Sequence, residues 1–81
     1  MDMCNIAQRL ETLFGAGTRP DLRRRLYSRL QALVEAEGEA AYRCIATAAA
    51  DARGKSSPGH YFARVVMCRL YERGVLATPE L

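Results

Sequence analysis

The stretch "EAAYRCIATAAADARGKSSPGHYFARVVMCRLYERG", residues 39–74, indicates most clearly which kind of fold this chain adopts. Its first part is rich in alanine and places Ala41, Ile45 and Ala48 on one side of a helix, because residues three and four apart share a helical face. The last part repeats this spacing with larger apolar side chains, at Phe62, Val65, Val66 and Leu70. The pattern predicts two amphipathic helices joined by a short turn.

The turn itself, "RGKSSPGHYF" at 53–62, resembles half of a phosphate-binding loop. Such a loop needs a glycine five positions before its Gly-Lys-Ser and a strand leading into it, because backbone amides must wrap the phosphate. Here that position is Ala49, and an alanine-rich helix precedes it. We therefore interpret Ser57 as the cap of the following helix and Pro58 as its first residue. Gly54 is expected to be the left-handed residue that ends the preceding helix.

Two further helices are expected before residue 38. The first has apolar residues at helical spacing at Met3, Ile6, Leu10, Leu13 and Phe14, and "GAG" at 15–17 ends it. The second opens with "TRPD", where Thr18 can cap the free amides, and Gly38 ends it. Its apolar stripe consists of Leu22, Leu26, Leu30, Leu33 and Val34. The chain is thus predicted to be all-α, a small four-helix bundle with helices at about 3–14, 19–36, 39–53 and 58–73.

Length and composition predict one helical domain spanning residues 1–81. A chain of 81 residues, 49% of them hydrophobic, can bury one modest core. No apolar run approaches the roughly 20 residues that a membrane span needs, and the first ten residues lack a signal-peptide pattern. We therefore expect a cytoplasmic protein that does not use a membrane as its partner.

Metal, cofactor and catalytic sites are not predicted. Cys4, Cys44 and Cys68 are far apart in the sequence, and with His60 they lack the close pairs that zinc sites use. The three thiols are expected to be reduced and mostly buried. The lone histidine has no orienting partner for acid-base work, so we expect no enzyme and no cofactor.

The charges are unevenly distributed along the chain. Residues 19–29 hold five arginines against one aspartate, for a net charge of +4. Residues 53–73 hold four arginines and a lysine against one glutamate, again +4. The remaining residues sum to −5, with an acidic corner at Glu35, Glu37 and Glu39, so the total of +3 hides two basic segments.

Two basic helices of this kind fit an anionic partner, because the planar guanidinium of arginine binds phosphate in a bidentate manner and stacks on bases. Tyrosine rings beside them would offer a stacking surface to an unpaired base. The candidate nucleic-acid-binding residues are Arg23, Arg24, Arg29, Lys55, His60, Tyr61, Arg64, Arg69 and Arg73. The alternative interpretation is that these basic faces are simply solvated surfaces.

The second half of the chain resembles a known family. The residues that carry the resemblance are Gly38, Glu39, Ala40, Ala41, Ser57, Pro58, Gly59, Tyr61, Phe62, Arg64 and Gly74. With them, residues 38–76 resemble the carboxy-terminal helical region of RepC-type plasmid replication initiators. The same region is more loosely similar to the DnaD-type primosome domain, with Phe62, Val66 and Leu70 at the positions of its last helix. The winged-helix domain that usually accompanies such regions does not occur in this sequence.

The resemblance implies an accessory DNA-binding module in replication, with DNA rather than RNA as the ligand and a replication protein as a further partner. A rival hypothesis is a protein interaction module that forms a homodimer or docks on a larger partner. It rests on apolar residues expected at the surface, namely Met67, Cys68, Val75 and Leu76. Small bundles often gain stability by association.

Overall fold

The computed structural model describes residues 5–15 and 19–77, which form four helices and, within those ranges, no strand. The helices are α1 (Ile6–Phe14), α2 (Pro20–Glu37), α3 (Glu39–Ala52) and α4 (Pro58–Glu72). The predicted all-α four-helix bundle is confirmed, and the bounds of the last three helices lie within one residue of the expected ones. The expected start of the first helix, at residue 3, lies outside the described residues.

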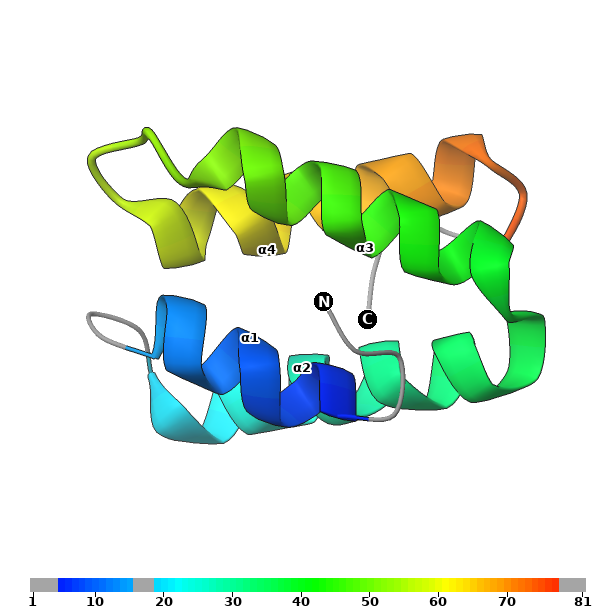
Figure 1. Ribbon diagram of the computed structural model, residues 1–81, viewed down its shortest axis with the longest axis horizontal. Helices are drawn as coiled ribbons and strands as arrows, with labels where there is room; N and C mark the ends of the chain where they lie inside the picture. Colours follow the sequence, from blue (N-terminus) through cyan, green and yellow to red (C-terminus); the bar gives the residue numbers. More distant parts are fainter. Residues whose placement is uncertain (1–4, 16–18, 78–81) are drawn as a thin grey trace.

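The helices form two antiparallel hairpins that lie as two layers, α1 with α2 and α3 with α4 (Figure 1). A single residue, Gly38, joins α2 to α3 and so turns the chain from one layer into the other. Its φ of +69° is a conformation that side-chain-bearing residues rarely adopt, which explains the glycine. Because each helix runs in the direction opposite to the one before it, α2 and α4 both begin at the same end of the molecule, at the left in Figure 1.

Aromatic side chains join the two layers. The Phe62 side chain of α4 is fully buried, and its ring stacks on that of Phe14 with centroids 4.9 Å apart. Tyr27 of α2 meets the same ring edge-on at 6.2 Å. Around these rings one core cluster draws buried side chains from all four helices, including Ile6, Leu10, Leu30, Ile45, Val66 and Leu70.

Small side chains on α3 let α4 lie close against it. Ala41, Ala48 and Ala52 are completely buried along one face of α3. The Cys44 Sγ on that face lies 3.8 Å from the backbone oxygen of Arg69 on α4. The alanine-rich pattern of the sequence therefore corresponds to a close helix pair.

Two leucines predicted to belong to the core are exposed instead. Leu13 is 41% exposed and Leu22 is 47% exposed. Leu13 borders a hollow beside α3 and Leu22 borders one beside the start of α4, so neither side chain is covered by the facing helix. The apolar stripes of α1 and α2 are thus narrower than predicted.

The helix ends confirm some of the predicted caps and correct others. At the end of α4, Gly74 has a φ of +82°, and the Val75 N–H donates to the Leu70 carbonyl at 2.9 Å. This bond is typical of a glycine-terminated helix, as expected. Gly54 does not play this role, because its φ is not positive and α3 ends through Arg53 in a right-handed conformation.

Ser57 occupies the predicted cap position of α4, but its side chain makes no capping hydrogen bond. At the start of α2 the cap position belongs to Arg19, which likewise makes no such bond with its side chain. The predicted cap Thr18 lies outside the described residues. None of the described helices is long and apolar enough to cross a membrane.

Candidate nucleic-acid interface

A groove of about 660 Å³ runs along the outer face of α4 and the loop that precedes this helix. Tyr61, Arg64, Val65 and Cys68 are spaced by three and four residues, so they share one face of α4. The loop brings further polar groups beside the first turn of the helix. The full lining is Lys55, Ser56, Ser57, His60, Tyr61, Arg64, Val65, Cys68, Arg69 and Glu72.

A cation and an aromatic ring meet at the beginning of this groove. The Lys55 Nζ lies 5.0 Å from the ring centroid of Tyr61, within the range of a cation–π interaction. The Tyr61 side chain is half-buried and packs against the core. Arg64, one turn further along α4, is exposed and has no carboxylate within ion-pair distance among the described residues.

The basic surface continues toward the end of α4. Arg69 forms an ion pair with Asp51 of α3, which neutralises part of its charge. Beyond it, Arg73 lines a second hollow of about 560 Å³ together with Arg43 of α3. The Arg43 guanidinium is 2.8 Å from the Glu39 carboxylate, so it too is partly compensated.

The two hollows adjoin at Arg69 and Glu72, and we call the predicted residues that line them the α4 strip: Lys55, His60, Tyr61, Arg64, Arg69 and Arg73. All of them were predicted from the sequence as nucleic-acid-binding residues. Sequence analysis did not predict Ser56 or Arg43, which share the same hollows. Ser56 could have been predicted, because it directly follows Lys55 in the sequence. Arg43 could not have been predicted, because only the packing of α3 on α4 brings it beside Arg73.

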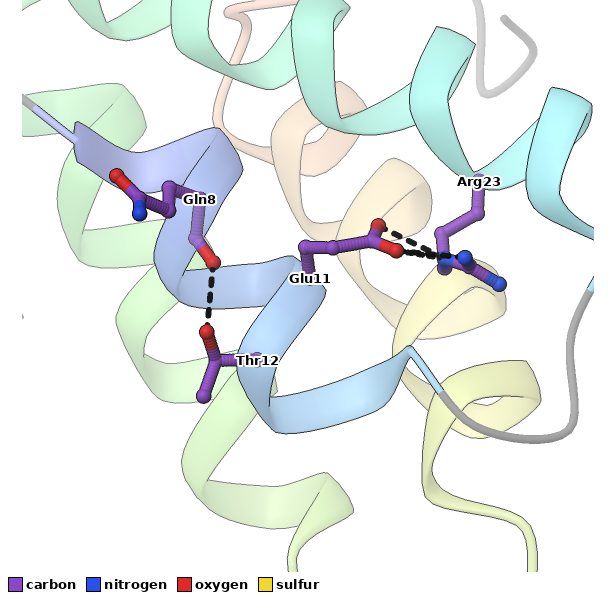
Figure 2. Close-up of polar contacts among 4 residues, drawn as sticks. All are labelled: Gln8, Glu11, Thr12 and Arg23. Carbon is purple, nitrogen blue, oxygen red and sulfur yellow. Dashed lines mark hydrogen bonds and ion pairs between the residues drawn. The ribbon is translucent and has the colours of Figure 1, made fainter.

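Arg23 does not join this surface. Its Nε donates to both carboxylate oxygens of Glu11 on α1, at 2.8 and 2.7 Å (Figure 2), and its side chain is only 10% exposed. These hydrogen bonds lower the pKa of Glu11. Nearby, the Thr12 hydroxyl donates to the Gln8 carbonyl at 3.1 Å, a bond within α1. Arg23 therefore joins α1 to α2.

The other two predicted arginines of α2 are exposed but lie away from the strip. Arg24 lines a hollow between α1 and α2 together with Gln8 and Ser28. Arg29 lines none of the hollows of the α4 strip. The structure thus brings together the predicted residues of α4 and its preceding loop, whereas those of α2 point elsewhere.

The cysteines differ from each other in their surroundings. Cys44 is buried, as predicted, but Cys68 is exposed in the α4 groove, because it lies on the face opposite the core. Cys4 lies outside the described residues. Within those residues, no group of three or more histidine, cysteine, aspartate or glutamate side chains is arranged to hold a metal ion.

Most of the apolar residues that were expected at the surface, and that would support a protein interaction module, are buried or partly buried in the structure. Met67 is 7% exposed and Leu76 is 8% exposed, so both belong to the core. Val75 is partly buried against them. Met67 is buried because it lies on the packed side of α4, whereas the turn after Gly74 folds Val75 and Leu76 back so that both their N–H groups donate to the Leu70 carbonyl.

Comparison of this chain with family models, curated proteins and solved structures gives no match. The resemblance to RepC-type initiators and to the DnaD-type domain therefore stays a prediction.

Proposed function

We propose that this chain is a small, non-enzymatic nucleic-acid-binding module that uses the α4 strip. The observation that supports the proposal most directly is that Lys55 and Arg64 line one groove and Arg73 lines the hollow that adjoins it at Arg69. None of the three is in an ion pair with a described carboxylate. Following the resemblance noted above, we infer DNA rather than RNA as the ligand, an accessory role in replication and a cytoplasmic location.

The chemistry of the strip fits a phosphate backbone. Lysine and arginine contacts to phosphates provide affinity without sequence preference, since they release condensed counterions. Tyr61 lies at the start of the strip, where one unpaired base could stack on its ring once Lys55 moves to a phosphate. Ser56 and Ser57 add hydroxyls that can donate to phosphate oxygens.

The proposal is tested by fluorescence anisotropy with labelled single-stranded and double-stranded DNA at about 50 and 200 mM salt. We expect saturable binding that weakens steeply between the two salt concentrations. The double variant Arg64→Glu with Arg73→Glu should weaken binding by roughly 10-fold to 100-fold, because each reversal replaces an attraction to phosphate by a repulsion.

The matched control reverses the same amount of charge on α2, as Arg24→Glu with Arg29→Glu. Because these residues lie outside the strip, the control should reduce affinity by less than about threefold at 200 mM salt, where long-range attraction is screened. Equal losses in the two double variants would mean that only net charge matters. Absence of binding to either DNA form at low salt would overturn the proposal.

The alternative is a protein interaction module that dimerises or docks on a larger protein. Of the residues on which it rests, Met67 and Leu76 are buried, Val75 is partly buried and Cys68 is exposed. Leu13 and Leu22 are further exposed apolar side chains that favour it. Light scattering across a wide range of protein concentrations tests the dimer. A mass that stays at one chain throughout would remove it, whereas a doubled mass that Leu22→Ser abolishes would support it.

A further inference from the structure

The two layers separate where α2 and α4 begin, and leave a groove of about 310 Å³ between them. Apolar side chains from both helices line most of it, in particular Leu22 and Leu26 of α2 and Met67 of α4. Two of the four α4 residues that line the groove are Gly59 and Ala63, which have almost no side chain to fill the gap. Its volume is at the lower end of the range found for small-molecule sites.

One end of this groove is electropositive for three reasons. The helices α2 and α4 both start there, so the positive ends of two helix dipoles lie together. Neither helix has its first amides capped by the side chain of its cap residue. Finally, the guanidinium-bearing residue Arg19 borders the groove.

The Arg19 guanidinium is available to an anion. Its separation from the Asp21 carboxylate is 3.7 Å, and both side chains are more than half exposed, so this pair is weak. Arg23 also borders the groove, but it is held by Glu11 and contributes mainly its aliphatic stem to the wall.

We propose that this groove binds a small amphipathic anion, such as an aliphatic or aromatic carboxylate or sulfonate. The apolar body of the ligand lies between Leu22, Leu26 and Ala63, and its acidic head lies at the starts of α2 and α4 beside Arg19. This site is separate from the proposed nucleic-acid surface, since it opens between the layers and shares only His60 with the α4 strip.

The probe is the fluorescent apolar anion 8-anilinonaphthalene-1-sulfonate, titrated into the folded wild-type protein. We expect saturable binding with one probe per chain. Dodecanoate should displace the probe, and dodecylammonium, which has the same chain and the opposite charge, should not. Arg19→Gln should weaken binding by about twofold to fivefold, because one favourable charge near two helix starts is removed.

Filling the groove provides the sharper test. Ala63→Phe places a ring in the apolar part and should weaken probe binding by at least about tenfold. The matched control is Ala46→Phe, which makes the same change at a half-buried alanine of α3, in a different hollow, and should leave binding unchanged. Circular dichroism establishes that both variants are folded. If Ala63→Phe does not fold, Leu22→Ser, at an exposed position, should weaken binding by about threefold or more.

The proposal is wrong if the probe does not saturate, if it binds folded Ala63→Phe as well as wild type, or if dodecylammonium displaces it as well as dodecanoate. None of these results bears on nucleic-acid binding, because Arg19, Leu22 and Ala63 lie outside the α4 strip. Conversely, a wild-type protein that binds the probe but binds neither DNA form would overturn the proposed function and leave the anion site intact.

Discussion

At the scale of single residues, the ion pair between Glu11 and Arg23 fastens α1 to α2. The hydrogen bonds from Arg23 lower the pKa of Glu11 below its usual value of 4.5. A carboxyl whose pKa is lower in the folded protein stabilises that state at neutral pH, and the stabilisation is lost as pH falls through the folded pKa. We therefore expect Glu11→Gln to lower the urea midpoint at pH 7 and to have little effect once the pH is well below 4.5.

The control for this prediction is Glu39→Gln, which removes the pair between Glu39 and Arg43. Both of those side chains are more than two-thirds exposed, so water already screens their charges. The control should change the midpoint less than Glu11→Gln does at pH 7. A Glu11→Gln effect of equal size at neutral and acidic pH would show that the substitution acts through packing and not through charge.

Also at this scale, burial changes the pKa of the Tyr27 hydroxyl. Its ring is 3% exposed, and burial raises the pKa of its hydroxyl to about 12. A group whose pKa is raised in the folded protein contributes its full stabilisation below its unfolded pKa and loses it as the pH rises through the folded pKa. The contribution of Tyr27 is therefore present at neutral pH and is lost in strong alkali as the pH approaches 12.

At the scale of the elements, the single-residue link between α2 and α3 depends on Gly38. Its φ of +69° suits glycine, and no heavy atom lies within 4 Å of the position that a Cβ would take. Replacement by alanine therefore costs backbone strain and not a steric clash. We expect Gly38→Ala to destabilise the fold by roughly 1–3 kcal/mol in urea unfolding.

Gly54 offers a matched comparison in the loop between α3 and α4. It too has open space around its Cβ position, but its φ is not positive. Gly54→Ala should therefore leave stability unchanged or raise it by about 0.4–1 kcal/mol, because alanine restricts the unfolded chain. If Gly38→Ala and Gly54→Ala destabilise the protein equally, the positive φ at position 38 does not require glycine.

At the scale of the whole molecule, the contacts between layers make the two hairpins interdependent. With only nine residues, α1 is too short to be a stable helix by itself in water, so it depends on packing. The Phe62 ring contacts Phe14 and Tyr27 in the opposite layer. We expect one cooperative thermal transition, with the same midpoint by far-ultraviolet and near-ultraviolet circular dichroism.

The variant Phe62→Ala tests this dependence. Removing a fully buried phenylalanine costs about 3–5 kcal/mol, which is a large fraction of the stability of a small domain. The variant should lose helix signal from both hairpins together. A remaining helical transition from one hairpin would mean that the two layers fold as independent units.

Much of the architecture could be predicted because it depends on local information. Apolar spacing of three and four residues indicated each helix, and glycine and proline marked its ends to within about one residue for α2, α3 and α4. The failures have a common cause. Leu13 and Leu22 were placed in the core by periodicity alone, yet whether a facing helix covers them depends on how the helices pack.

The same difference between local information and packing between helices applies to the candidate site. Residue type and order indicated that the segment around α4 is basic, because the density of charge along a chain can be read from the sequence. The sequence could not predict in this way that Arg23 forms an ion pair with Glu11, twelve positions earlier. Such pairing depends on how close two helices lie and at what rotation.

The sequence by itself determined four helices, their boundaries and an uneven distribution of charge, since these depend on residues within a few turns of one another. Only the tertiary structure decided which arginines remain on a common surface and which are paired, and where small side chains leave a groove between the layers. The physical reason is that burial and ion pairing arise from contacts between segments distant in the chain. Those contacts exist only once the two hairpins have packed together.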